Sequence, residues 1–546
     1  MERVAPAEPE PGAWRHRHRL PLLATLPVLP LYAVWWLFLA TGGGDLAAQE
    51  AWADFVARHG GSAYSLFWYG GMHTASYSLI SPYLMAACGV RTVTVVSGLA
   101  ASWLAAVLVG RAGLRRPLGP ALLASLALWC NVACGRTTFA LGTALGLAAC
   151  VPLTRMPRER RGRPVALAVV CAALATMASP VAGLFLAVVG AGFLLVRDWV
   201  RAAALLAPPA VVVGLTTLLF PFTGEQLMPA ARIWPPVLLG LTVTALAPRG
   251  WRVARWSGFV YAAGTVLAYL VASPVGTNVE RFAALFAPAV LLAALLTVRG
   301  VRRALLVAVL VFALVWVGRK TADDLTEYTA VPAWAAETQG VVRALDRLGA
   351  DRTRVEAVPA RDHREATALA PHVNLARGWN RQLDMERGRL FYDGTFSETT
   401  YRAWLDHWAV GYVVLPLGKP DGYARQEAAL VRSRPPWLEP VWRDAHWQVY
   451  RVRDAVPLVS PPATVVRTTG AEVRLRMPRP GSVTVRIAYS PWLRSDGGCL
   501  GRDGDGGRDG DGEFTRLTVA EPGEYRISSE YGPSRRPPSP GARARC

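Results

Sequence analysis

Residues Gly42–Pro82 read GGGDLAAQEAWADFVARHGGSAYSLFWYGGMHTASYSLISP and follow directly after the first long apolar run of the chain. This segment holds the first carboxylates after that run, Asp45, Glu50 and Asp54, together with two histidines and several aromatic residues. Most of the sequence up to about residue 318 is apolar and poor in charge, so few other segments could place acidic chemistry beside a membrane. The segment is therefore either a catalytic loop or a connector.

The composition indicates that the first part of the chain is a polytopic membrane protein. Hydrophobic residues make up 52% of the 546 residues and charged residues 18%, and the mean hydropathy is +0.25. Much of the net charge of +20 comes from short arginine clusters between apolar runs. That placement is typical of a membrane topology signal and argues against a surface that binds nucleic acid.

Apolar runs of membrane-spanning length divide this part of the chain into about eleven expected spans. They cover approximately residues 20–40, 90–109, 118–132, 138–153, 165–178, 181–196, 202–220, 236–247, 258–271, 282–298 and 304–317. The first run is too long for a signal-peptide core and lacks a clear cleavage site, so we expect it to remain as an anchor. Residues 77–89 are too short to span a bilayer and suit an interfacial or re-entrant piece.

Arginine clusters predict the orientation of these spans. Alternate connections are arginine-rich: RAGLRRP from Arg111, RMPRERRGRP from Arg155, RDWVR from Arg197, PRGWRVARW from Pro248 and RGVRR from Arg299. Under the positive-inside rule these connections and residues 1–19 face the cytoplasm, because the other connections carry isolated basic residues. An odd number of spans then leaves everything after Gly318 outside the cell membrane. The expected membrane domain is 20–318, with 42–82 as its large first outer loop.

The remainder of the chain has the composition of a soluble protein. Expected helices at 333–348, 397–408 and 423–432 alternate with expected strands at 354–358, 411–416 and 447–453, and Ser397 is placed to cap the second helix. This pattern predicts an α/β domain over 319–455. Short alternating strands with Gly and Pro turns then predict a β-sandwich over 456–531 and a disordered tail over 532–546. The Asp-Gly-rich segment 502–513 lacks the ligand spacing of an EF-hand and is expected to be a hairpin loop.

On this topology the polar residues at the outer membrane face form a short set. They are Asp45, Glu50, Asp54, His59 and His73 in the first outer loop, and Arg136, Glu225, Arg232, Asn278, Glu280 and Arg281 in later connections. A carboxylate near the interface can act as a general base, and arginine can hold phosphate through two hydrogen bonds. The set suits glycosyl transfer from a lipid-linked phosphate sugar. Asp45, nearest the end of the first span, is the best candidate for the base.

Each candidate also has a plain structural interpretation. Asp45 could cap the helix that follows it, and Glu50 and Asp54 have the spacing of a solvated helix face. Arg281 could anchor a span at the lipid headgroups. His59 and His73 are far apart and have no third ligand at metal spacing, so no metal site is predicted.

The order of these features resembles the GT-C superfamily of integral membrane glycosyltransferases: a first span, a large outer loop opening with Asp45, about eleven spans and an extracytoplasmic C-terminal part. The pieces LARGWNRQLD, RLFYDG and WLDHWAVGYVVLP also look like large uncharacterised membrane proteins of actinobacteria. Members often show an acidic pair in the first loop, whereas here Asp45 is followed by Leu46 and the next acid is Glu50.

The resemblance implies a polyprenyl-phosphate sugar donor and a cell-envelope glycan or glycolipid as acceptor. Asp45 would then be the base, and the substrate and its phosphate would be bound by residues drawn from Arg281, Asn278, Glu280, Arg136, Arg232 and His73. The family sometimes uses a divalent metal ion. Two other functions remain open: a non-catalytic scaffold for envelope assembly, and a transporter. The transporter is disfavoured because the chain shows no internal repeat and few ionisable groups within its spans.

Overall fold

The computed structural model describes residues 11–156, 161–222, 224–504 and 513–532. Residues 505–512 of the Asp-Gly-rich segment, nearly all of the expected C-terminal tail and the first ten residues lie outside these ranges. Internal contacts divide the chain into two compact units. We call residues 1–40, 91–215 and 227–325 the membrane unit, and residues 41–90, 216–226 and 326–546 the sheet unit.

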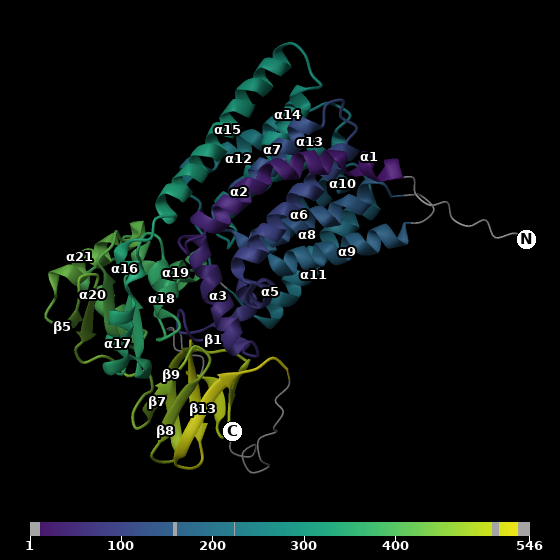
Figure 1. Cartoon of the computed structure of the whole chain (residues 1–546). Helices are drawn as coiled ribbons and strands as arrows, with labels where there is room; N and C mark the ends of the chain where they lie inside the picture. Colours follow the sequence, from purple (N-terminus) through teal and green to yellow (C-terminus); the bar gives the residue numbers. More distant parts are fainter. Residues whose placement is uncertain (1–10, 157–160, 223, 505–512, 533–546) are drawn as a thin grey trace, which may run out of the picture. The chain divides into compact units, whose positions relative to one another are not determined.

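The membrane unit consists of helices (Figure 1). They are α1 (Pro11–Thr25), α2 (Leu29–Val34), α6 (Val90–Arg111), α7 (Leu118–Ala133), α8 (Thr137–Thr154), α9 (Gly162–Ala178), α10 (Pro180–Leu195), α11 (Trp199–Leu219), α12 (Trp234–Leu246), α13 (Arg252–Leu270), α14 (Glu280–Leu295) and α15 (Val301–Tyr328). Among the described residues, six helical segments are long and apolar enough to cross a membrane. The chain is therefore a multi-pass membrane protein. Each expected span falls on helical structure, while the count of about eleven crossings stays a prediction.

Small residues allow close packing between helices of this unit. α8 packs against α9 (Figure 1), and α12 packs against α13. A Cβ atom added to Gly258 of α13 would lie 2.7 Å from the carbonyl oxygen of Gly240 on α12, so glycine is needed at this crossing. Such approaches are the usual source of helix association in lipid, where burial from water contributes little.

The first part of the sheet unit is a mixed four-stranded sheet with the order β3-β4-β6-β5. Its strands are β3 (Arg354–Ala357), β4 (Val410–Pro416), β5 (Leu438–Arg443) and β6 (Trp447–Val452), and the β3–β4 pair is parallel. The main helices around it are α17 (Gln339–Arg347), α18 (Arg364–Leu369), α19 (Arg381–Arg387), α20 (Glu398–His407) and α21 (Arg425–Ser433). Ser397 caps α20 as predicted, because its side chain accepts a hydrogen bond from the Thr400 amide at 3.1 Å. Strand β5 was not predicted.

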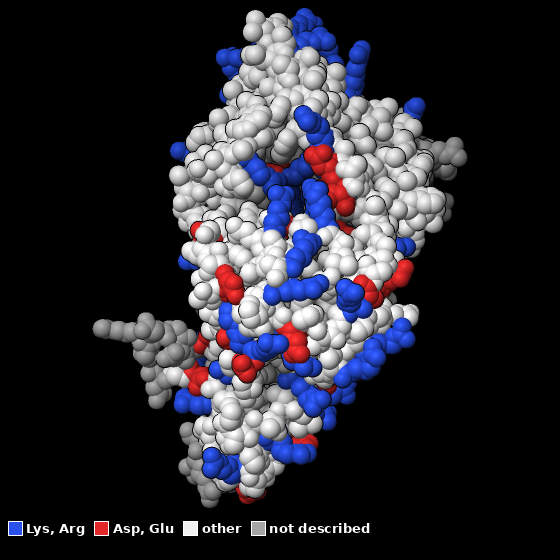
Figure 2. Space-filling model, turned by 90° about the vertical axis from the view of Figure 1, so that its left-hand side faces the viewer, with Lys and Arg blue, Asp and Glu red and all other residues white. Residues whose placement is uncertain are grey.

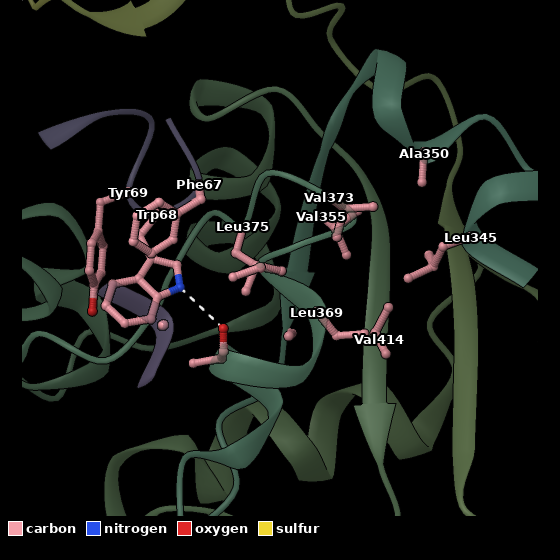
Figure 3. Packing of buried hydrophobic residues seen from close by; sticks show 14 of the residues in the cluster. Phe67, Trp68, Tyr69, Leu345, Ala350, Val355, Leu369, Val373, Leu375 and Val414 are labelled. Atoms are coloured by element: carbon pink, nitrogen blue, oxygen red, sulfur yellow. Dashed lines mark hydrogen bonds between the residues drawn. The ribbon is translucent and has the colours of Figure 1, made fainter. Parts of the chain in front are cut away.

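The segment Gly42–Pro82 is built into this sheet unit. It forms α3 (Asp45–His59), β1 (Tyr64–Ser65), β2 (Met72–His73), α4 (Thr74–Tyr77) and the start of α5 (Ser81–Cys88). Phe67 and Trp68 join the same buried cluster as Val355 and Val414 of the central strands (Figure 3). The Trp68 indole also donates a hydrogen bond to the carbonyl of Ala366 at 3.3 Å. The segment therefore serves as a structural part of the unit in addition to any chemical role.

The C-terminal part is sheet-rich, as predicted. One sheet has the order β10-β13-β8-β7 and the other β11-β12-β9. Their strands are β7 (Thr464–Thr468), β8 (Val473–Met477), β9 (Gly481–Ala488), β10 (Leu493–Ser495), β11 (Cys499–Arg502), β12 (Phe514–Val519) and β13 (Gly523–Ser529). Alternate residues of β8 and β12 are buried, which is the pattern of strands with one face on a core. The exact domain boundaries expected from the sequence stay a prediction, and α15 continues to Tyr328, past the expected boundary at Gly318.

Candidate functional site

A cluster of charged side chains lies at one end of the membrane unit. Glu280, the first residue of α14, is 2% exposed. Arg232 donates two hydrogen bonds to its carboxylate, at 2.7 and 2.8 Å, and Lys320 of α15 forms an ion pair with the same group. Arg136, directly before α8, pairs with Asp324 of α15 at 3.0 Å. The cluster therefore connects α15 with the start of α14, the residue before α8 and the short 3₁₀ turn Ala230–Arg232 that precedes α12.

Arg281 and Asn278 lie beside this cluster. Arg281 follows Glu280 in α14, and its guanidinium carbon lies 5.3 Å from the ring centre of Phe139 in the first turn of α8. Asn278 belongs to the short 3₁₀ turn Gly276–Val279 that leads into α14. We call Arg136, Arg232, Glu280, Arg281, Lys320 and Asp324 the cationic cluster. The structure thus brings together four residues expected from the sequence, Arg136, Arg232, Glu280 and Arg281, and adds two.

The cationic cluster contains four cations and two carboxylates, so cations outnumber carboxylates among these six residues. Its side chains are not sealed in: 44% of the Arg232 side chain and 25% of the Lys320 side chain remain exposed. On the face shown in Figure 2, Lys and Arg cover more of the surface than Asp and Glu. A partly exposed surplus of arginine and lysine is suited to an anion with several acceptor oxygens.

Asp45 belongs to the sheet unit, at the first position of α3. The N-cap position is occupied by Gly44, which has φ +62°, and Asp45 is the first helical residue, so Asp45 is not the capping residue that it could have been from the sequence. The Gly44 amide donates to the Asp362 carbonyl at 2.8 Å, and its carbonyl accepts from the Trp379 indole at 2.9 Å. These bonds hold the backbone of the residue before Asp45 in place. Asp45 itself is half-buried. A carboxylate at this end of a helix is stabilised by the helix dipole.

The segment Arg361–Glu365, five ionisable residues in a row, lies next to this turn and was not singled out from the sequence. Arg364 donates to the Thr41 hydroxyl at 2.9 Å and to the Tyr328 carbonyl at 2.8 Å. The imidazole of His363 stacks on Trp379 with ring centres 3.5 Å apart, and Asp45 is among the charges that act on it. His363 has φ +56°, a conformation that is uncommon outside glycine and that often marks functional sites. The run of five ionisable residues is the signal by which Arg361–Glu365 could have been identified from the sequence.

Burial controls the protonation of His363. Only 3% of the residue is exposed, and burial lowers the pKa of its imidazole to about 3, against the opposing effect of Asp421. The imidazole is therefore neutral at neutral pH. Its Nε2 atom lies 3.8 Å from the Asp421 carboxylate, and its Nδ1 atom lies 3.8 Å from Glu365. Both distances exceed that of a hydrogen bond.

The other candidates of the first loop are placed within the sheet unit. His73 is 7% exposed and its Nε2 atom lies 2.9 Å from the Ser490 hydroxyl. Burial, helped by the charge of Arg387, lowers the pKa of His73 to about 4, which leaves it neutral at neutral pH. Asp54 pairs with Arg58 one turn along α3, and both side chains are more than one third exposed. Asp54 and Arg58 therefore lie on a solvated face of α3.

Two members of the cationic cluster, Lys320 and Asp324, were missed from the sequence. They lie in a stretch that was assigned to the start of the soluble part, whereas α15 runs through it. Lys320 could have been noticed in the sequence because it is one of two lysines in a chain rich in arginine. Within the described residues, no group of three or more His, Cys, Asp or Glu side chains is arranged so that it could hold a metal ion.

Comparison with known proteins gives a limited family match and similar folds. Residues 460–497, from just before β7 to the loop after β10, match a domain of unknown function, DUF8823. No curated protein matches the chain. Among solved structures, the arabinofuranosyltransferase AftD from Mycobacteria aligns over 96% of this chain and 57% of its own, with 13% identity and a TM-score of 0.43. ArnT from Cupriavidus metallidurans aligns over 79% of this chain and 97% of its own, with 13% identity and a TM-score of 0.38.

This chain spans about three fifths of the length of the AftD structures that it matches. AftD and ArnT are membrane glycosyltransferases of the GT-C superfamily, which is the superfamily that the sequence resembles. The likeness is one of overall alignment and assigns no role to any residue of this chain.

Proposed function

We propose that this protein is a membrane glycosyltransferase that moves a sugar from a polyprenyl-phosphate donor to a glycan or glycolipid acceptor at the outer face of the cell membrane. The observation that carries the proposal is the cationic cluster, in which four cations and two carboxylates gather at the end of a membrane-spanning bundle and the Arg232 and Lys320 side chains stay partly exposed. A phosphate released by glycosyl transfer carries the complementary charge. The arginine-rich connections lie at the opposite helix ends and favour a cytoplasmic N-terminus.

Arg136, Arg232, Arg281 and Lys320 would bind the phosphate of the donor. Arginine presents paired N–H groups to phosphate oxygens, and Arg232 already shows this geometry toward the Glu280 carboxylate. The carboxylates Glu280 and Asp324 hold Arg232, Lys320 and Arg136 in place before the substrate arrives. Preorganised cations of this kind stabilise charge as it develops on a leaving group.

Asp45 would act as the general base. In the reaction, the acceptor hydroxyl gives its proton to the Asp45 carboxylate while its oxygen forms a bond to the anomeric carbon of the sugar. The bond between that carbon and the phosphate oxygen breaks, and the phosphate leaves with the electron pair. A half-buried carboxylate on a fixed helix start is suited to this role, because its backbone is held by Asp362 and Trp379.

A transfer assay with Asp45→Asn tests this assignment. Purified protein in vesicles is given a labelled polyprenyl-phosphate sugar and envelope glycan acceptors, and label in the acceptor is measured. We expect Asp45→Asn to lower transfer about 10²–10⁴-fold, because general-base catalysis contributes that much. The matched control is Asp54→Asn on the same helix, where an exposed carboxylate paired with Arg58 is replaced, and it should keep wild-type activity.

Equal loss in both variants would point to damage to α3 and not to a missing base. Full activity of Asp45→Asn would exclude Asp45 as the base while leaving the cationic cluster as the phosphate site. Absence of transfer from every donor with wild-type protein would contradict the proposed function itself and favour a scaffold.

A further inference from the structure

The sheet unit contains a polar pocket of about 440 Å³. Its walls come from the last turn of α3, from α17 with the 3₁₀ turn Ala350–Arg352 that follows it, from residues 370–374, and from the end of β7 with the residues after it. Most of the residues that line it are polar or charged. Ligand pockets measure about 300–1,000 Å³, so a pocket of this size accommodates a small organic ligand.

Contacts within the sheet unit hold the walls of the pocket in place. The Thr468 hydroxyl, at the end of β7, donates a hydrogen bond to the Asp351 carbonyl at 2.7 Å. Leu345 and Val373 line the pocket and belong to the buried cluster shown in Figure 3. The pocket is therefore formed before a ligand arrives, as ligand sites usually are.

Three side chains of different chemical kinds line this pocket without bonding to another residue that the structure describes. Asn374 is 6% exposed, yet its side-chain amide makes no hydrogen bond within the described ranges. Likewise, the Arg467 guanidinium and the Asp351 carboxylate form neither a hydrogen bond nor an ion pair with any described residue. A nearly buried amide that bonds to no protein group calls for an explanation, and a bound ligand supplies one.

Positive and negative charges are both present at the pocket. The charged residues that line it are Arg58, Arg343, Arg467, Asp346 and Asp351. Because Arg58 is paired with Asp54, the three arginines are matched in number by three carboxylates. Burial, helped by the charge of Arg58, lowers the pKa of both His59 and His372, so these two lining imidazoles are neutral at neutral pH. A ligand with a strong charge of either sign would meet like charges here, which is unfavourable.

The mixture of donors and acceptors favours a neutral ligand that is rich in hydroxyl groups. Arg467 offers only hydrogen-bond donors, Asp351 offers only acceptors, and the amide of Asn374 offers both. A hydroxyl group donates one hydrogen bond and accepts two, so a molecule with several hydroxyl groups can satisfy all three side chains. The sequence predicts that this unit lies outside the cell membrane, where the sugar polymers of a cell envelope are found.

We infer that this pocket binds a neutral glycan, whose hydroxyl groups bond to Arg467, Asp351 and Asn374. The pocket is separate from the candidate base. Asp45 begins α3 and Arg58 lies in its last turn, so the two residues are about 20 Å apart along the helix. The inference concerns binding alone, and it holds whether or not the protein transfers sugar.

Calorimetric titration of the full chain in detergent tests the inference. The probes are short neutral oligosaccharides of arabinose, galactose, mannose or glucose, with inorganic phosphate and an oligogalacturonate as anions. We expect wild-type protein to bind a neutral oligosaccharide, and Arg467→Met to weaken that binding about tenfold. The variant should fold, because the Arg467 side chain bonds to no other described residue. The matched control is Arg476→Met on β8, an exposed arginine outside the pocket that pairs with Glu524, and it should keep wild-type affinity.

A second variant, Asp351→Ala, separates a sugar site from an anion site. A neutral oligosaccharide loses an acceptor and should bind about fivefold more weakly, whereas an anion would bind more tightly once the carboxylate is gone. Absence of binding by every neutral oligosaccharide would overturn the inference. So would tighter binding of phosphate or the oligogalacturonate than of every neutral probe, or unchanged sugar affinity in Arg467→Met. Sugar binding that depends on Arg467 in a protein that transfers no sugar would support the inference and contradict only the proposed function.

Discussion

The cationic cluster of the membrane unit and a buried ionic network in the sheet unit contain the same types of charged residue but differ in exposure and in the balance of charge. In the network, Arg377 contacts Glu356 at 2.7 Å, pairs with Glu427 and lies 4.0 Å from Asp384. These four side chains are less than one tenth exposed, and the Arg377 guanidinium also stacks on Phe391 at 3.7 Å. In the cationic cluster, by contrast, cations are in surplus and Arg232 is nearly half exposed.

This difference in exposure and in the ratio of cations to carboxylates distinguishes a candidate binding site from a structural ionic network. Carboxylates outnumber the cation in the network, and burial raises the pKa of both Glu356 and Glu427. The Tyr401 hydroxyl donates to Glu427 at 2.9 Å, so the network links strand β3 with helices α19, α20 and α21. Its groups are engaged with one another and are closed to solvent. The cluster keeps exposed positive charge that a substrate can neutralise.

The largest expected effect is on stability, from Arg377→Met. The change leaves Glu356 and Glu427 buried without their cation, and breaking a buried ion pair costs about 3–5 kcal/mol. Hydrogen exchange of the backbone amides of β3 and β4 should therefore accelerate strongly, and the melting temperature of the purified protein should fall. The matched control is Arg451→Met on β6, whose pair with Glu439 is more than one third exposed on both sides; such pairs contribute about 0–1 kcal/mol. Similar exchange in the two variants would contradict a structural role for the network.

A smaller effect, on substrate affinity, is expected from Lys320→Gln in the cationic cluster. Glu280 keeps its two hydrogen bonds from Arg232 in this variant, so the fold should persist. One ionic contact to the donor phosphate is lost, which is worth about 1.5–3 kcal/mol, or roughly a 10–100-fold rise in KM. Arg319→Gln, at the exposed neighbouring position, is the control and should leave KM unchanged. If Lys320→Gln lowered the melting temperature as much as Arg377→Met, the cluster would be a structural network too.

The architecture could be predicted from the sequence to a large extent, because its signals are local. The apolar runs identify the helices of the membrane unit, and the Ser397 cap and the alternating strands after residue 456 follow from short-range patterns. Strand β5 was missed, since its residues Leu438–Arg443 include Pro440 and lack clear alternation. The end of α15 was missed because its composition becomes polar while the helix continues.

The candidate site was predictable in part. Arg136, Arg232 and Arg281 could be identified because a charged residue between apolar runs is conspicuous. Their partners Lys320 and Asp324 could not, since pairing across helices that are distant in sequence depends on packing. The support of Asp45 by Trp379 and Asp362 is likewise a contact between residues more than three hundred positions apart, which periodicity does not reveal.

The smallest expected effect is a pH dependence of stability due to His73. Burial lowers the pKa of its imidazole to about 4 in the folded protein, whereas an unfolded histidine has a pKa of about 6.5. The unfolded state therefore binds the proton first, and stability is lost as the pH falls below about 6.5 toward 4. Between about pH 7.5 and 5 this one group should cost about 2 kcal/mol. His73→Asn keeps a polar partner for Ser490 but does not titrate, so its melting temperature should fall less steeply over the same range. Parallel pH profiles for the two proteins would show that His73 does not control this dependence.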